Sequence, residues 1–214
     1  MRLYLVRHGQ TAWNLEGRAQ GHTDIPLDAT GLAQAAAVAH AMRGLALDKV
    51  WSSDLARASQ TGSAIAEACG CPLLTAKEFR ERSFGSMEGT PYLDLRRAAE
   101  EEAEVQETSS LQVRIGGGES VEDVWDRVAE RLWEIESAHH DLCLVSHGGT
   151  CAVVVAQLLR GSLETVRAFK FGNASLTELQ RHPDGHWTLL RYNDTSHLAA
   201  PSAPMIDLNH GVKS

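Results

Sequence analysis

Two short runs of consecutive apolar residues stand out along the chain, at residues 3–6 and 142–145. A run that is apolar at every position, without alternation, is typical of a strand covered on both faces, as in a parallel sheet. Each run leads at once into polar residues and glycine, as Arg7-His8-Gly9 and as Ser146-His147-Gly148. The pattern therefore predicts two buried strands that bring two imidazoles to the same edge of one sheet.

Other segments between and after these runs have helical or alternating patterns. Helical spacing, alanine content and capping residues predict helices at residues 30–42, 54–68, 121–135 and 150–159. Shorter apolar stretches at 49–51 and 71–75 predict further strands, and alternation at 174–181 and 186–193 predicts a hairpin. Strands that alternate with helices predict an α/β fold with a mostly parallel sheet. In such sheets ligands bind beyond the carboxyl ends of the strands, where residues 7–8, 52–53 and 146–147 would meet.

The chain has 214 residues, of which 43% are apolar, and it contains no long linker rich in glycine, serine or proline. This composition predicts a single domain over residues 1–200. The segment 91–107 is predicted to be a charged helix, poor in large apolar residues, so residues 86–115 would serve as a cover over a site. The tail at 201–214 has two prolines and no periodic pattern, and we expect it to be loosely held.

The formal charge of −8 argues against a general nucleic-acid binder or a protein that binds anionic membranes. A small anionic substrate would need a local cationic pocket, for which Arg7 is the first candidate. The N-terminus leads directly into a strand, and no apolar run reaches about 18 residues, so we expect a cytoplasmic protein.

The cysteines complete no metal site, and one pair of histidines, His182 and His186, has a spacing that suggests metal ligands. Cys69 and Cys71 are close together, but no second pair completes a zinc site, and reduced structural thiols are expected. His182 and His186 are predicted to lie on a hairpin rather than on a helix, so we predict no metal site there.

An ordered set of motifs across nearly the whole chain resembles the histidine phosphatase superfamily, the phosphoglycerate mutase-like proteins, on its phosphatase branch. The motifs are Arg7-His8-Gly9 with Thr11 and Trp13-Asn14, Gly17–Gly21, Ser52–Thr61, Glu81-Arg82-Ser83-Phe84-Gly85, Gly118-Glu119-Ser120 and Ser146–Gly149. The resemblance implies a three-layer α/β/α sandwich, phosphoglycerate mutase-like, with a mostly parallel central sheet of about six strands.

The same resemblance implies a role for each site residue. His8 would take up the phosphoryl group as nucleophile, which suits a neutral imidazole because a covalent intermediate divides one difficult step into two. Arg7 and Arg57 would hold the phosphoryl oxygens, since guanidinium groups match phosphate geometry. His147 would donate to the same group. The remaining contacts to phosphoryl group or substrate would come from Asn14, Gln20, Gly21 and Gly148, the last at the start of a helix whose N–H groups face an anion.

The departing alcohol needs a proton, and Glu81 is the candidate general acid, by its place in the Glu-Arg-x-Phe-Gly motif. It would also be the base that activates water in the second step. A bound phosphate dianion would favour the protonated form of this carboxyl. Glu78 and Glu88 are rivals for the role, although Glu88 is expected to be structural.

Three functions remain open at this point. The favoured one is hydrolysis of small phosphorylated metabolites, a metal-independent reaction through a phosphohistidine on His8, with no cofactor. The second is a phosphoglycerate mutase that depends on 2,3-bisphosphoglycerate. It is less favoured because residues 83–113 offer only Arg96-Arg97 and then an acidic run over 100–104, which would repel a multiply charged substrate. The third is a non-catalytic protein that binds a phosphate ligand. We expect a small anionic phosphoester as the partner, no nucleic acid and no membrane, and leave a homodimer open.

Overall fold

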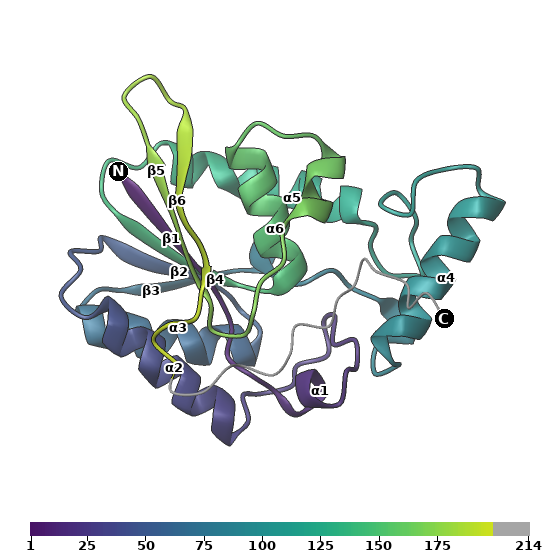
Figure 1. Cartoon of the computed structure of the whole chain (residues 1–214), viewed down its shortest axis with the longest axis horizontal. Coiled ribbons are helices and arrows are strands. Elements are labelled where there is room, and N and C mark those ends of the chain that lie inside the picture. Colours follow the sequence, from purple (N-terminus) through teal and green to yellow (C-terminus); the bar gives the residue numbers. More distant parts are fainter. Residues whose placement is uncertain (199–214) are drawn as a thin grey trace.

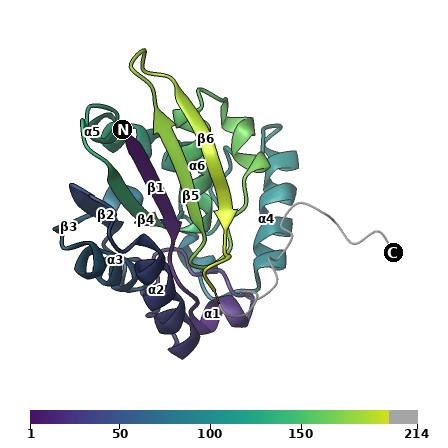
Figure 2. The same ribbon diagram turned by 60° about the vertical axis from the view of Figure 1, so that its left-hand side comes forward.

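A six-stranded mixed sheet forms the centre of the computed structural model, which describes residues 1–198. The strand order is β3-β2-β4-β1-β5-β6. Strands β3, β2, β4 and β1 are parallel, whereas β5 is antiparallel to both β1 and β6 (Figures 1 and 2). The strand bounds are β1 Arg2–Arg7, β2 Lys49–Ser53, β3 Leu73–Ala76, β4 Leu142–Ser146, β5 Leu176–Arg181 and β6 Trp187–Asp194. The predicted α/β fold is confirmed, with the expected hairpin as its antiparallel part.

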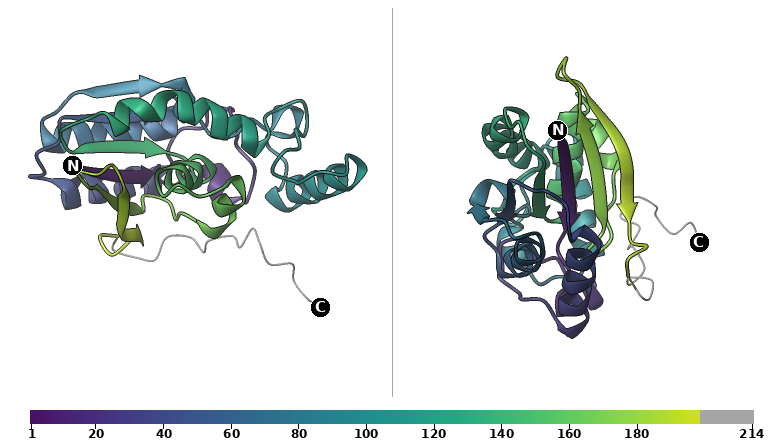
Figure 3. Two further views of the ribbon diagram at one scale, coloured as in Figure 1. Left: turned by 90° about the horizontal axis from the view of Figure 1, so that it is seen from above. Right: turned by 90° about the vertical axis from the view of Figure 1, so that its left-hand side faces the viewer.

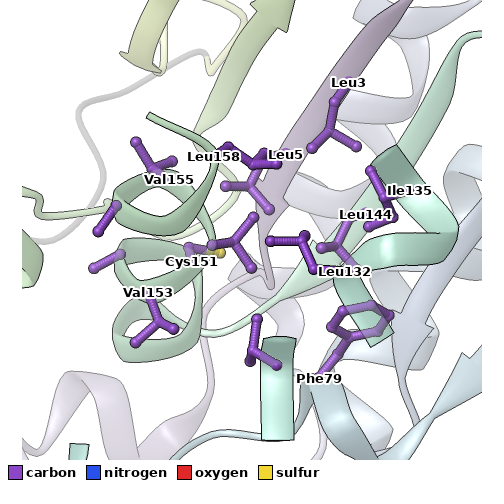
Figure 4. Close-up of a cluster of buried hydrophobic side chains, with 14 of the residues drawn as sticks. Leu3, Leu5, Phe79, Leu132, Ile135, Leu144, Cys151, Val153, Val155 and Leu158 are labelled. Carbon is purple, nitrogen blue, oxygen red and sulfur yellow. The ribbon is translucent and has the colours of Figure 1, made fainter. Parts of the chain in front are cut away.

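Alternate residues of β1 point to opposite faces of the sheet and enter two separate apolar clusters. Leu3 and Leu5 pack with helices α5 (Val121–Glu136) and α6 (Gly148–Leu158), as Figure 4 shows for the buried side chains of that face. Tyr4 and Val6 pack on the other face with α2 (Ala29–Met42) and α3 (Ala56–Cys69). The period of two along a strand thus produces the three predicted layers, which are seen edge-on in Figure 3.

Most helix ends follow the residues that the sequence offers. Asp28 caps α2, Gly70 ends α3 in the left-handed conformation, and Ser120 with Asp123 forms a capping box for α5. The start of α3 differs from the predicted helix over 54–68, because the side chain at its N-cap position makes no capping hydrogen bond. The Asp54 carboxylate instead accepts two hydrogen bonds from the Arg80 guanidinium, at 2.7 and 2.6 Å, and the helix begins only at Ala56.

The cover segment stands beyond the carboxyl ends of the parallel strands (Figures 1 and 3). It contains a short 3₁₀ helix, Gly85–Met87, and helix α4, Tyr92–Val105. Leu95, Ala99 and Ala103 form one buried stripe of α4 and join Phe84, Val113 and Ile115 in a third apolar cluster. A second 3₁₀ helix, Lys77–Phe79, precedes the cover segment. The short helix α1, Ala12–Leu15, follows β1.

Two further expectations concern membrane spans and the tail of the chain. No helix within residues 1–198 is long and apolar enough to cross a membrane. The predicted loose tail at 201–214 lies outside the described residues.

Candidate active site

Two imidazoles lie side by side where β1 and β4 end. The strands pair in register with Arg7 opposite Ser146, and the His8 N–H donates to the Ser146 carbonyl at 2.9 Å. The ring centroids of His8 and His147 are 5.1 Å apart, and both side chains are buried. The prediction that two strand-end histidines meet at one sheet edge is therefore confirmed.

Two arginines lie beside these rings, Arg57 buried and Arg7 half-buried. The Arg57 guanidinium donates to His147 Nδ1 at 3.2 Å and to the carbonyls of Gly21 and Thr23 at 2.7 and 3.0 Å. Arg7 donates to the Phe171 carbonyl, and its Nε has no hydrogen-bond partner among the described residues. Within residues 1–198 no carboxylate forms an ion pair with either guanidinium. Buried charges are normally paired, so this site is suited to an anion.

The hydrogen bonds assign complementary protonation to the two rings. His8 Nδ1 lies 2.6 Å from the Gly9 carbonyl oxygen, which can only accept, so Nδ1 carries the proton and Nε2 has the lone pair. His147 Nδ1 accepts from Arg57, so its Nε2 carries the proton, and this buried N–H has no partner among the described residues. The site thus presents one nucleophilic nitrogen and one unused donor.

Electrostatics keep both rings neutral. Burial, reinforced by the Arg57 and Arg7 charges, holds the pKa of His8 well below its ordinary value. The pKa of His147 is lowered in the same way, by burial first and then by Arg57. Burial also lowers the pKa of Arg57 to about 10, which leaves this guanidinium charged at neutral pH.

Glu81 lies at the same cavity, and its carboxylate is oriented by backbone groups. It accepts from the Gly149 N–H at 3.1 Å and from the Arg82 N–H at 3.0 Å. The Gly149 N–H at the start of α6 is therefore occupied by a carboxylate, contrary to the expectation that it would be free for an anion. Gly148 does line the cavity and lies against Arg7.

The rival carboxylates are engaged elsewhere. Glu78 pairs with Arg131 at 2.9 Å, and Glu88 accepts from the N–H groups of His22 and Thr23 at 2.9 and 2.8 Å. Neither lines the cavity, so the structural role expected for Glu88 is confirmed.

Arg127 on α5 fixes the backbone that carries Glu81. Its guanidinium donates to the carbonyls of Glu78 and Glu81 at 2.7 and 2.9 Å and pairs with the Glu119 carboxylate at 2.8 Å. His22 adds a ring-nitrogen contact of 2.9 Å to the Glu81 carbonyl. Arg127 belongs to no motif, and only its inward place on an amphipathic helix could have indicated it.

The remaining predicted contacts divide into two groups. Asn14 and Gln20 line the cavity, and the buried Gln20 Oε1 has no partner among the described residues. Gly21 does not line it, because its carbonyl is turned toward Arg57 instead. Asn173, which sequence reasoning missed, donates to the carbonyls of His8 and Gly9 and to Asn14 Oδ1, at 3.2–3.3 Å.

The expectation that Ser52 and Ser53 reach the same crevice is wrong. Both are buried, and neither lines the cavity. The Ser52 hydroxyl donates to the Ser53 carbonyl at 2.8 Å, and the Ser53 hydroxyl accepts from the Leu55 N–H at 3.3 Å. Because β4 separates β2 from β1, these hydroxyls lie at the turn into α3 and satisfy its backbone.

The cavity has a volume of about 610 Å³ and opens between the strand ends and the cover segment. Arg7, Arg57 and Glu81 form its charged end, where the neutral His8 also lies. Within residues 1–198, no three His, Cys, Asp or Glu residues are grouped so that they could hold a metal ion, and the four cysteines form no disulfide.

Comparison of the sequence with known proteins identifies the family of the chain. The sequence pattern of the histidine phosphatase superfamily, branch 1, matches residues 3–195. The chain belongs to this superfamily. A probable phosphoglycerate mutase GpmB from Salmonella choleraesuis (strain SC-B67) is 34% identical over 209 residues, which cover 94% of this chain and 97% of that protein.

Solved structures of similar proteins have the same fold. A mycobacterial glucosyl-3-phosphoglycerate phosphatase in complex with VO3 superposes with a TM-score of 0.77 at 30% identity, covering 91% of this chain and 99% of that one. A putative α-ribazole-5′-P phosphatase from Escherichia coli K-12 gives a TM-score of 0.79 at 28% identity, covering 91% and 96%.

The neutral, buried histidines make stability depend on pH. In the unfolded chain each histidine would titrate near its ordinary pKa of about 6.5. Below that pH the unfolded chain binds more protons than the folded one. Stability is therefore fully present above about pH 6.5 and falls on acidification, by up to about 1.4 kcal/mol per pH unit for each such histidine.

Urea unfolding of the wild type and His147→Asn at pH 5, 6 and 7 checks this expectation. The variant should lose free energy of unfolding with falling pH less steeply than the wild type, by about 1 kcal/mol per pH unit. His140→Asn, at an exposed position, is the matched control. Identical slopes for the wild type and His147→Asn would contradict a neutral buried ring.

Proposed function

We propose that the protein is a metal-independent phosphomonoesterase, which hydrolyses small phosphorylated metabolites through a phosphohistidine on His8. The observation that carries the proposal is a neutral imidazole with its lone pair on Nε2, beside two guanidinium groups that form no ion pair with a carboxylate within residues 1–198. A phosphoryl group would supply the missing negative charge. The mycobacterial phosphatase of similar fold has been solved in complex with VO3 and with inorganic phosphate, which supports the binding of an anion by this fold.

In the first step, His8 Nε2 would attack phosphorus and form the P–N bond as the ester P–O bond breaks. Arg7 and Arg57 would bind the non-bridging oxygens, and the unpaired His147 N–H would donate to one of them. Protonated Glu81 would deliver its proton to the departing oxygen, so that an alcohol leaves.

In the second step, the Glu81 carboxylate would take a proton from water while the water oxygen attacks phosphorus. The P–N bond then breaks, inorganic phosphate leaves, and His8 and protonated Glu81 are restored. Arg127 would act indirectly, because it holds the backbone of residues 78–81 against α5.

The mutase remains the second candidate, since the curated relatives are named probable phosphoglycerate mutases. The same His8 chemistry would then return the phosphoryl group to phosphoglycerate, with 2,3-bisphosphoglycerate as primer. Conversion of 3- to 2-phosphoglycerate only after bisphosphate is added would favour it over hydrolysis. The cytoplasmic location stays a prediction.

Hydrolysis of p-nitrophenyl phosphate in the presence of EDTA tests the central proposal. The wild type should turn over, and His8→Ala should lose roughly a thousandfold or more in kcat because the nucleophile is gone. His40→Ala, at an exposed position on α2, should behave as wild type. Wild-type activity in His8→Ala, or loss of activity with EDTA, would refute the proposal.

Glu81→Gln tests the general acid, because an amide cannot deliver the proton. The loss in kcat/KM should be about 10²-fold or more for an alkyl phosphate and smaller for p-nitrophenyl phosphate, whose leaving group is stable as an anion. Glu101→Gln, on the exposed side of α4, is the control. Equal losses for the two esters would argue against the proton-donor role.

A further inference from the structure

The part of the cavity away from His8 has apolar walls that come from two different clusters. On the side of the cover segment, Leu95 and Ala99 belong to the cluster formed with Phe84. On the side of the sheet, the walls belong to the cluster of α5 and α6, and comprise Val124, Ala152, Val153, Val166 and Phe171. The cavity therefore separates two apolar surfaces that would otherwise pack on each other.

Three arginines at this end of the cavity are paired with neighbouring carboxylates. Arg18 pairs with Glu16 and Arg96 with Glu100, each at 2.8 Å, and Arg167 pairs with Glu164 at 2.9 Å. The Arg82 guanidinium lies over the Phe84 ring at 4.8 Å, and Lys170, which also lines the cavity, is not without a partner.

The acidic run of α4 is mostly turned away from the cavity. Glu100 lines it, whereas Glu101, Glu102 and Glu104 do not. The helical period explains this arrangement, because Leu95, Ala99 and Ala103 fix the inner face of α4. Of the acidic run that is expected to repel a multiply charged substrate, only Glu100 therefore reaches the cavity. An anionic group placed against the apolar walls would lose its hydration without gaining a partner there.

We propose, resting on the proposed function, that the organic group of the substrate is predominantly apolar, an alkyl or aromatic phosphomonoester without a second anionic group. The phosphoryl group would lie at Arg7, His8 and Arg57, and the organic group would lie between Leu95 on one side and Val153 and Phe171 on the other. A volume of about 610 Å³ is enough for such a group, since small-molecule sites range over roughly 300–1,000 Å³. Hydroxyl groups placed against these apolar side chains would have no hydrogen-bond partner there.

A series of straight-chain alkyl phosphates from ethyl to octyl tests the inference on the wild-type enzyme. The alcohols differ little in acidity, so the chemical step stays nearly constant and kcat/KM reports burial of the chain. We expect kcat/KM to rise about two- to fourfold per methylene group until the cavity is filled. Glucose 6-phosphate and 3-phosphoglycerate should be poorer substrates than hexyl phosphate.

Substitution of one wall residue provides the matched comparison. Leu95→Gln should lower the ratio of kcat/KM for octyl to ethyl phosphate by about tenfold. Leu93→Gln, on the same helix but 61% exposed, should leave that ratio unchanged. The wild-type series stands without either variant should Leu95→Gln fail to fold.

The outcomes separate the two proposals. A flat series, or a preference for 3-phosphoglycerate, with p-nitrophenyl phosphate still hydrolysed, would overturn the inference and leave the phosphomonoesterase intact. No hydrolysis of any ester, p-nitrophenyl phosphate included, would overturn the proposed function itself.

Discussion

Two guanidinium charges beside two buried imidazoles, with no carboxylate in direct ion-pair contact within residues 1–198, are the constraint on which this site depends. A buried charge without a counter-ion is costly, and the fold tolerates Arg57 because three neutral acceptors share its N–H groups. The same charges disfavour protonation of His8 and His147. The same arrangement therefore favours the binding of an anion and keeps the nucleophile that would attack it neutral.

The sheet topology brings these groups together. Because β1 and β4 are parallel neighbours, their carboxyl ends place His8 and His147 in contact. The backbone of Gly9, which follows His8, runs close to Gly31 of α2. A Cβ at Gly9 would lie 2.5 Å from the Gly31 carbonyl oxygen, so only glycine allows this turn. This turn fixes the position of the Gly9 carbonyl, which accepts from His8 Nδ1. Backbone packing thus sets the tautomer of the reactive ring.

Much of this could be predicted from the sequence, because the signals are local. Apolar runs ending in His-Gly indicate buried strands, and helical spacing over 121–135 indicates the amphipathic helix α5. The misplaced residues depend on contacts between distant segments. The Gly21 carbonyl accepts from Arg57, and the Asp54 carboxylate accepts from Arg80. The Gly149 N–H donates to the Glu81 carboxylate.

Residues that act through backbone carbonyls are the hardest to predict. Arg127 and Asn173 each hold carbonyl groups near the site, and a carbonyl leaves no trace in the sequence that could mark its partner. Sequence reasoning accordingly identified side chains whose type suggests chemistry, and missed those that only position them. The rotation of α4, which turns most of its acidic run outward, is likewise decided by the cluster it packs in.

The most direct test of the central claim is an NMR titration of the His8 imidazole nitrogens, with His8 assigned by comparison with His8→Gln. The account predicts a neutral ring with its proton on Nδ1, unchanged from pH 8 down to pH 5.5. Protonation of that ring with a midpoint near 6.5, or a proton on Nε2 at neutral pH, would contradict it.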